Sequence, residues 1–461
     1  MVDLGPSDPI SEDEIKHGAD LYNTELAEAD LSEASLSDSK LKRCDLSGAN
    51  LKKSDLSEAA LDMADLSGAD LSEANLEGAT FTNADLTETN LSKTNISDTK
   101  INASSFTGVV FDSANISRGN LAAKDLPETS FVEAELCHTK FTRAKLTKAN
   151  FSKADLTHAN LSGADLEDAN LSSSNMISAE LYRANLEGSD LSNTDLTEAD
   201  LSEANLKNAD LSNADLTEAD LSEANLENAD LSNADLTEAD LSGAYLGSTN
   251  ISGVEINNQN LSGVYFSNLN LPVDDLSGLN LSEAVLFGMD LAGVDLRDTD
   301  LSGANLRETN LSNADLESAD LSGADLRETN LSNADLELAN LTEAVLSGAT
   351  LEMANLSGVD LTKADISNAR LRGATLFDAD LSDSDLSGSD LTKTDLTDVH
   401  FTNTNLELAN LSHAEISGAD FRGANVTTTR LFQVIMEESD EKYVTLSDLE
   451  LLGATVREEN K

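Results

Sequence analysis

Large apolar residues recur at every fifth position along nearly the whole chain. The series begins at Leu21 and continues without a break to Leu431, and its 83 positions hold 65 Leu, 9 Phe, 7 Ile, Met176 and Val426. The position two residues before each of these is usually small, most often Ala, and the other three positions are mostly polar. Because only 39% of the chain is hydrophobic, this order indicates one structural unit repeated many times.

A period of five residues fits neither a long helix nor a long strand. Five residues advance a helix by about 500°, so successive Leu would spread around its surface. In a strand, an odd spacing would place successive Leu on opposite faces. The pattern therefore predicts short extended pieces joined by turns, with every central Leu pointing to the same side.

A second period of twenty residues sets the size of a larger unit. Residues 191–210 and 211–230 are nearly identical, and residues 301–320 and 321–340 also match closely. Four pentapeptides therefore make one turn of a four-sided coil, and successive coils pair through backbone hydrogen bonds at the usual strand spacing of about 4.8 Å. About 21 such coils would stack into an all-β solenoid, a rod roughly 100 Å long.

The repeated motif is Ala-(Asp/Asn)-Leu-x-x, as in Ala199 to Glu203. It resembles the motif of the pentapeptide-repeat family, and the resemblance covers about nine tenths of the chain. The resemblance implies a right-handed quadrilateral β-helix in which the central Leu and the small residue two before it point inward. One large and one small apolar residue on each side would fill a narrow interior without voids.

The repeat leaves a segment outside it at each end of the chain. Residues 1–20 are expected to form an N-terminal cap or a disordered segment, residues 21–436 the β-helix, and residues 437–461 a C-terminal cap or tail. Caps are expected because the open ends of a solenoid expose strand edges that pair with other chains.

Both end segments contain a helix signal. Ser11 followed by Glu14 is a capping-box pattern, which predicts a short helix over Ser11 to His17. Near the C-terminus, the pair Ser447 and Glu450 is a second such pattern, whereas residues 446–456 also resemble a resumed coil. The sequence leaves these two alternatives open.

Two stretches break the rule that the inward position is small. The exceptions are Val109, Gly119, Lys124 and Thr129 near Pro127, and then Val254, Gln259, Val264, Leu269, Asp274, Leu279, Met289 and Val294 near Pro272. An unpaired charge inside a coil is costly, so the coil is expected to be distorted near Lys124 and Asp274. Such a stretch is either a bend or docking site, or drift in a tolerant repeat, which is the simpler explanation.

The chain carries 86 Asp and Glu against 29 Lys and Arg, a net charge of -57. Nucleic acids and anionic membranes attract clustered Lys and Arg, so neither is expected as a direct partner. No apolar run approaches the roughly 20 residues of a membrane span, and Cys44 and Cys137 indicate reduced thiols in a cytoplasmic protein. The acidity indicates either a salt-adapted source, such as a halophilic archaeon, or a partner that normally holds DNA.

Acidic residues concentrate on one of the four predicted sides. The side that contains Leu36 carries 25 acidic and 2 basic outward residues, whereas the side that contains Leu31 carries 12 and 8. On the first of these sides, eight successive coils present the acidic ladder: Asp195, Asp215, Asp235, Glu255, Asp275, Asp295, Asp315 and Asp335. We expect this ladder either to bind a basic protein or to be a solvated face suited to high salt.

No catalytic, metal or cofactor site is expected. His138 and His158 lie one coil apart on one side, and exposed surface histidines explain them better than a metal site, because no third ligand is evident. The sequence has no glycine-rich phosphate loop and no calcium-binding nonapeptide. We therefore expect a protein that is not an enzyme.

The leading interpretation is a non-catalytic acidic rod that acts as a protein-interaction scaffold. The family resemblance implies an alternative, because some members are acidic, rod-shaped DNA mimics that occupy the DNA-binding saddle of gyrase and dimerise through a C-terminal helix. The charge density of the repeat approaches that of duplex DNA, about one charge per 1.7 Å. The alternative is therefore a DNA-mimicking binder or inhibitor of a type II DNA topoisomerase such as gyrase, with a homodimer formed through the C-terminal end.

Overall fold

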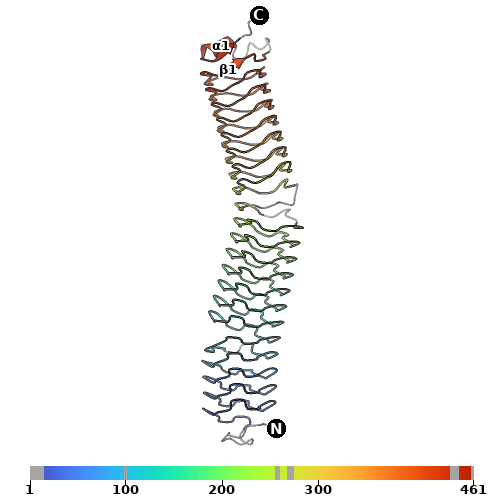
Figure 1. Ribbon diagram of the computed structural model, residues 1–461, viewed down its shortest axis with the longest axis vertical. Helices are drawn as coiled ribbons and strands as arrows, with labels where there is room; N and C mark the ends of the chain where they lie inside the picture. The colour runs from blue at the N-terminus through green and yellow to red at the C-terminus, as the bar shows by residue number, and fades with distance from the viewer. Residues whose placement is uncertain are drawn as a thin grey trace. The chain divides into compact units, whose positions relative to one another are not determined.

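The computed structural model describes residues 15–97, 99, 101–254, 260–266, 275–436 and 446–457. The chain divides into two compact units. Unit 1 comprises Met1–Asp240 and Thr249–Ile256, and unit 2 comprises Leu241–Ser248 and Asn257–Lys461. Each unit is a stack of coils (Figure 1).

Each regular pentapeptide folds as a tight turn followed by a bridge residue. In the pentapeptide that starts at Leu201, the N–H of Ala204 donates to the carbonyl of Leu201 at 3.0 Å, and Glu203 has a φ of 55°. A positive φ at the third position is typical of a type II turn. Among the described residues, Thr428 is the only β-branched residue with a positive φ, because β-branched side chains fit the left-handed region worst.

Residues twenty positions apart pair through parallel β-bridges. Asp200 pairs with Asp220, and the next three bridge positions pair in the same register, so this regular coil has a bridge on each of four sides. Between the bridges, the N–H of Leu201 donates to the carbonyl of Asp220 at 2.7 Å. One coil therefore takes twenty residues, as the larger sequence period predicts.

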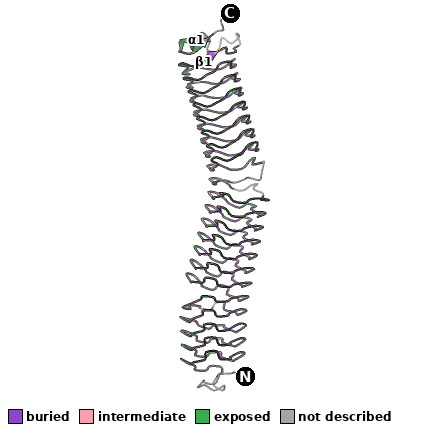
Figure 2. Ribbon diagram, in the orientation of Figure 1, coloured by how far each residue is buried: buried purple, intermediate pink, exposed green. Residues whose placement is uncertain are grey.

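The interior of each regular coil is filled by the central residue and the small residue two before it. Leu201 and Leu206 are fully buried, and Ala199 and Ala204 are each 1% exposed. The same alternation of buried and exposed residues continues along the coils (Figure 2). Burial of one Leu side chain contributes roughly 1.5–3 kcal/mol, so these interior positions are the main source of stability.

Aromatic residues replace Leu in one part of the interior of unit 1. Phe131 lies between Phe111 and Phe151, with ring centroids 5.2 and 4.7 Å away and nearly parallel planes. Phe141 meets the ring of Phe131 edge-on at a centroid distance of 5.7 Å. All four side chains are at most 1% exposed, so this packing joins three successive coils.

The residue before each central Leu is usually Asp or Asn, and its side chain forms a second turn. Oδ1 of Asp200 accepts the N–H of Ser202 at 3.0 Å, and Oδ1 of Asn170 accepts the N–H of Ser172 at the same distance. Asp and Asn offer the same acceptor oxygen in such an Asx turn. This outward position is therefore part of the fold, which the hydrophobic period does not indicate.

The C-terminal part of unit 2 contains strand β1 (Arg430–Phe432), helix α1 (Leu446–Leu451) and strand β2 (Thr455–Arg457), and Figure 1 labels β1 and α1. Strands β1 and β2 pair in parallel, with Arg430 opposite Thr455. Leu449 on α1 is fully buried. Residues 446–451 therefore follow the helix alternative, and the resumed coil predicted over residues 446–456 is limited to the strand Thr455–Arg457.

The first described residues already follow the repeat. Residues 11–14 lie outside the described residues, and the prediction of a helix is wrong for residues 15–17. The N–H of Ala19 donates to the carbonyl of Lys16 at 3.0 Å, and the N–H of Gly18 donates to Ser37 at 2.7 Å. These are the bonds of a regular pentapeptide, so pairing with the next coil overrides the local capping-box pattern.

Larger apolar residues at the inward position of unit 2 stay inside the coil. The exposed fractions are 0% for Val264, 5% for Leu279, 6% for Met289 and 8% for Val294. Gln259, Leu269, Pro272 and Asp274 lie outside the described residues, and so does the distortion expected near Asp274.

Candidate protein-binding surface

The acidic ladder is divided between the two units. In unit 1, Asp195 pairs with Asp215 and Asp215 with Asp235 through parallel bridges, so these three carboxylates belong to adjacent coils. In unit 2, adjacent bridges join the other described members, namely Asp275, Asp295, Asp315 and Asp335. Glu255 lies outside the described residues. The twenty-residue spacing thus aligns the carboxylates within each unit as predicted.

Each ladder Asp in unit 1 also forms an Asx turn. The N–H groups donating to Oδ1 are those of Thr197, Thr217 and Thr237, at 3.1, 3.0 and 2.9 Å. The hydroxyls of the same threonines donate to the same oxygens at 2.7, 2.6 and 2.6 Å. All of these turn hydrogen bonds go to Oδ1, and Oδ2 takes no part in them.

The turn hydrogen bonds favour the charged form of two ladder carboxylates, Asp235 and Asp275. The hydroxyl and N–H of Thr237 lower the pKa of Asp235, and hydrogen bonds from Ser277 lower the pKa of Asp275. A group whose pKa is lowered stays ionised at a more acidic pH than an ordinary carboxyl group. Asp235 and Asp275 therefore stay ionised at a more acidic pH than an ordinary carboxyl group does.

A cation interrupts the ladder in unit 2. The guanidinium of Arg297 binds Asp295 through two hydrogen bonds, with Nε 2.9 Å from Oδ1 and Nη2 2.5 Å from Oδ2, and lowers the pKa of that carboxyl group. Its Nε also lies 3.5 Å from Oδ2 of Asp315. The spacing of central residues could not reveal this pairing, because Arg297 lies two positions after Asp295.

Unit 1 has a second column of carboxylates beside the ladder. The sequence Asp-Leu-Thr-Glu occurs three times in register, which adds the exposed Glu198, Glu218 and Glu238 to the three ladder residues. None of these six carboxylates forms an ion pair with a described residue. We call the six residues Asp195, Glu198, Asp215, Glu218, Asp235 and Glu238 the acidic surface. The sequence analysis did not single out these glutamates, although the exact repetition of Asp-Leu-Thr-Glu could have indicated them.

The two cysteines are free and differ in exposure. Cys44 occupies an inward position and is buried, and its Sγ donates to the carbonyl of Leu21 at 2.7 Å. Cys137 is half-buried, and its Sγ donates to Oδ2 of Asp155 at 3.1 Å. Burial, followed by the hydrogen bond and charge of Asp155, raises the pKa of Cys137 from 9.0 to about 11. This thiol is therefore a poor nucleophile at neutral pH.

We expect iodoacetamide to alkylate Cys137 at pH 8 about 100-fold more slowly than an ordinary exposed thiol. The thiolate fraction falls about tenfold for each unit by which the pKa rises above the pH. The measurement is the alkylation rate against pH in a Cys44→Ala background, and the rate should rise until about pH 11. Asp155→Asn keeps the turn acceptor but removes the charge, so it should speed the reaction. Equal rates in both proteins would contradict the role of Asp155.

His138 and His158 lie together on the side that carries the acidic surface. The rings of His138 and His158 stack with their centroids 4.9 Å apart. Among the residues that the structure describes, no group of three or more His, Cys, Asp or Glu side chains is arranged to hold a metal ion. Across all of the described residues, no helix has the length and apolar character needed to cross a membrane.

The parallel bridges at intervals of twenty residues define a β-solenoid built from pentapeptides. The chain belongs to the pentapeptide-repeat family. The family profile described as "Pentapeptide repeats" matches residues 149–188, 179–217, 214–253, 280–317, 319–352, 354–392 and 389–427. A second profile, "Pentapeptide repeat region", matches residues 34–111 and 74–151. Proteins of this family fold as right-handed quadrilateral β-helices and are in general non-catalytic structural or scaffold proteins.

Several solved structures of the family are similar to this chain. HetL, a pentapeptide repeat protein involved in heterocyst differentiation regulation in the cyanobacterium Nostoc sp. strain PCC 7120, is 32% identical, with 51% of this chain and 90% of HetL covered and a TM-score of 0.30. Full-length QnrB1, a plasmid-mediated fluoroquinolone resistance protein, is 18% identical, with 50% and 89% covered and a TM-score of 0.18. A protein of the Arabidopsis thaliana thylakoid lumen is 30% identical, with 26% and 71% covered and a TM-score of 0.13. No curated protein matches the chain.

Proposed function

We propose that this chain is a non-catalytic acidic solenoid that acts as a scaffold and binds a basic partner protein through the acidic surface. The observation that carries the proposal is the set of six carboxylates on three adjacent coils, none of which forms an ion pair with a described residue. Aligned charges of one sign steer an oppositely charged partner and fix its register. The proposal takes the coil to be right-handed and quadrilateral, with about 21 turns.

A DNA-mimicking binder or inhibitor of a type II DNA topoisomerase such as gyrase is the second candidate. The acidic surface supports it, because two carboxylates per coil at a rise of about 4.8 Å give roughly one charge per 2.4 Å on a single side. Duplex DNA carries about one charge per 1.7 Å. A groove that accepts DNA would therefore meet a similar charge density on this side.

Three further features belong to the same proposal. Both cysteines are free, which supports a cytoplasmic location. The excess of carboxylates supports a salt-adapted source organism. Leu451 and Leu452 are 85% and 56% exposed near the end of α1, which supports a homodimer formed through the C-terminal end.

The test compares two triple variants that remove equal charge from two sides. Asp195→Asn/Asp215→Asn/Asp235→Asn acts on the ladder, and Asp190→Asn/Asp210→Asn/Asp230→Asn acts on the side that contains Leu31. Asn keeps the Asx turn, as Asn170 does with Ser172 at 3.0 Å. The matched positions also form Asx turns, with Ser212 donating to Asp210 at 2.9 Å.

Supercoiling by purified gyrase is the first measurement. If the second candidate holds, the native protein inhibits at micromolar concentration, the ladder variant is at least tenfold weaker, and the matched variant keeps its potency. An absence of inhibition rejects the topoisomerase candidate. The scaffold proposal is then tested by affinity capture on all three proteins. A basic partner must be retained by the native and matched proteins and lost from the ladder variant, and equal retention on all three refutes the assignment of this surface.

A further inference from the structure

Pairing between two successive coils of unit 1 is interrupted. In the last regular rung, the N–H of Asn115 donates to the carbonyl of Thr94 at 2.9 Å. One step further along, the N–H and carbonyl of Asn120 make no hydrogen bond to the described residues of the coil below it. The N–H of Ile101, which would reach that carbonyl in the regular pattern, donates instead to Thr99 at 3.0 Å. Among the described residues, the backbone donor and acceptor of Asn120 therefore both lack a partner in the coil below.

The interruption continues around the next corner of the coil. The N–H and Oγ of Ser104 both donate to Ala84 in the coil below, at 2.7 and 2.9 Å. In regular coils that carbonyl receives the N–H of the following position. The bonds from Ala103 to Ala122 and from Asp125 to Ser104 are consequently absent among the described residues. Pairing resumes where the N–H of Ser130 donates to Val109 at 3.2 Å.

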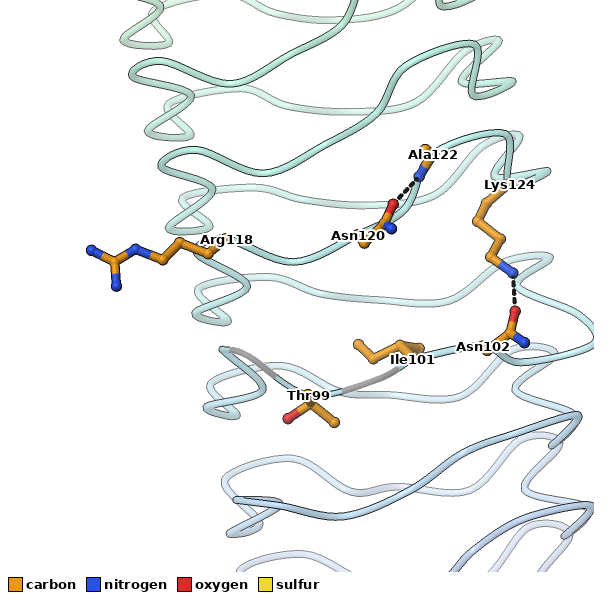
Figure 3. A pocket seen from close by; sticks show the side chains of 7 residues that line it. All are labelled: Thr99, Ile101, Asn102, Arg118, Asn120, Ala122 and Lys124. Atoms are coloured by element: carbon orange, nitrogen blue, oxygen red, sulfur yellow. Dashed lines mark hydrogen bonds between the residues drawn. The ribbon is translucent and has the colours of Figure 1, made fainter.

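Lys124 occupies the inward position above this gap, where regular coils carry Ala. Its ammonium leaves the interior, crosses the gap and donates to Oδ1 of Asn102 at 2.5 Å (Figure 3). It also lies 5.9 Å from the centroid of the Phe106 ring. The side chain is half-buried, which confirms the expectation that the coil is distorted near Lys124 so that its charge reaches water.

The gap forms a cleft of about 460 Å³, which lies within the usual range of ligand sites, about 300–1,000 Å³. Asn102 and Lys124 lie at one end, and Arg118 lies at the other end with its guanidinium directed away from Lys124 (Figure 3). Between them, Oδ1 of Asn120 accepts the N–H of Ala122 at 3.1 Å. The walls are therefore mainly polar, and the two charged residues among the described lining residues, Lys124 and Arg118, are both basic.

The charge of this cleft is opposite to that of the chain as a whole. Residues 118–153 contain seven Lys and Arg against four Asp and Glu, whereas the chain has a net charge of -57. Neither Lys124 nor Arg118 forms an ion pair with a described residue, although other lysines do, such as Lys145 with Asp125 at 3.4 Å. An anionic ligand would be repelled from most of the surface and attracted here.

We propose that this cleft binds an extended acidic peptide segment of a partner protein. The peptide pairs its backbone with the free N–H and carbonyl of Asn120, as a strand adds to an open sheet edge. A carboxylate of the peptide takes the ammonium of Lys124 from Asn102, because a charge-assisted hydrogen bond is stronger than one to an amide oxygen. The site is separate from the acidic surface, and it selects a ligand of the opposite charge.

The test measures binding of labelled peptides to the full-length protein by fluorescence anisotropy in 0.15 M KCl. The probes are a fluorescein-labelled pentapeptide of sequence TEVET and the equally labelled counterpart TQVQT, which lacks the two Glu carboxylates. We expect TQVQT to bind at least tenfold more weakly than TEVET. Lys124→Met should weaken TEVET binding at least tenfold, whereas the matched variant Lys148→Met, in a regular coil, should change it less than twofold. No TEVET binding at millimolar concentration, or equal effects of the two variants, would overturn the proposal.

Hydrogen exchange distinguishes strand pairing from simple attraction between charges. Bound TEVET should slow exchange of the Asn120 amide at least tenfold and leave the amide of Asn170, in a regular coil, unchanged. Glutarate, which carries two carboxylates but no peptide backbone, should not protect Asn120. Binding of TEVET without protection of Asn120, or equal protection by glutarate, would refute the strand-pairing mode. Lys124→Met should melt at the temperature of the native protein, which shows that lost binding does not reflect unfolding.

Discussion

Replacing Phe131 with Ala is expected to lower the free energy of unfolding of the surrounding coils by about 3–5 kcal/mol. The side chain is fully buried between Phe111 and Phe151, so its removal loses apolar burial, leaves a cavity and ends two ring-stacking contacts. Repeats contact only their neighbours, so the loss should stay local. Amides of residues 111–151 should exchange roughly 100- to 5,000-fold faster.

Phe131→Leu is the matched control, because Leu holds most central positions of the repeat. It should cost about 1–2 kcal/mol, since part of the volume remains and Leu already fits the coil. Amides of coils beyond residue 190 should exchange at the native rate in both variants. Equal destabilisation by Ala and Leu, or faster exchange throughout unit 1, would contradict local packing around this ring.

Raising KCl from about 0.1 to 2 M is expected to raise the melting temperature of the protein by about 10 °C. Bridged aspartates such as Asp210 and Asp230 place like charges one coil apart, and each such pair repels by around 1 kcal/mol in water. The Debye length falls from about 10 Å at 0.1 M salt to about 3 Å at 1 M, so concentrated salt removes most of this repulsion.

Circular dichroism melts across the KCl series measure this effect. The variant Asp190→Asn/Asp210→Asn/Asp230→Asn separates charge from other actions of salt. It should melt above the native protein at low salt and respond less to added KCl. A melting temperature that is constant or falls with KCl would contradict the salt-adapted interpretation of the acidity and leave partner binding as its explanation.

The coil could be predicted from the sequence because the residues that fill its interior recur with a fixed hydrophobic period. The central Leu and the small inward residue were assigned correctly, and the twenty-residue repeat gave the register of pairing that joins Asp200 to Asp220. The positive φ of Glu203 and the Asx turn of Asp200 were missed. Both features depend on hydrogen bonds within polar segments, which the period of the hydrophobic residues does not reveal.

The candidate sites were predictable only in part. Side assignment brought Asp195, Asp215 and Asp235 together, but it could not show that Arg297 would bind Asp295. Lys124 was recognised as misplaced in a coil interior, whereas its contact with Asn102 was not. That contact forms because backbone pairing between these two coils is interrupted. The interruption reflects a balance between backbone pairing and side-chain burial over many residues, so no single sequence position predicts it.

The equivalence of Asp and Asn in the Asx turns separates the charge of this protein from its fold. Codons for the two residues differ by one base, so a single point mutation can add or remove a negative charge while the turn acceptor stays in place. The same exchange is available wherever Asp or Asn precedes the central residue, which is most sides of the coils. A lineage could therefore retune its electrostatics for a new salinity or a new partner in small, structurally neutral steps.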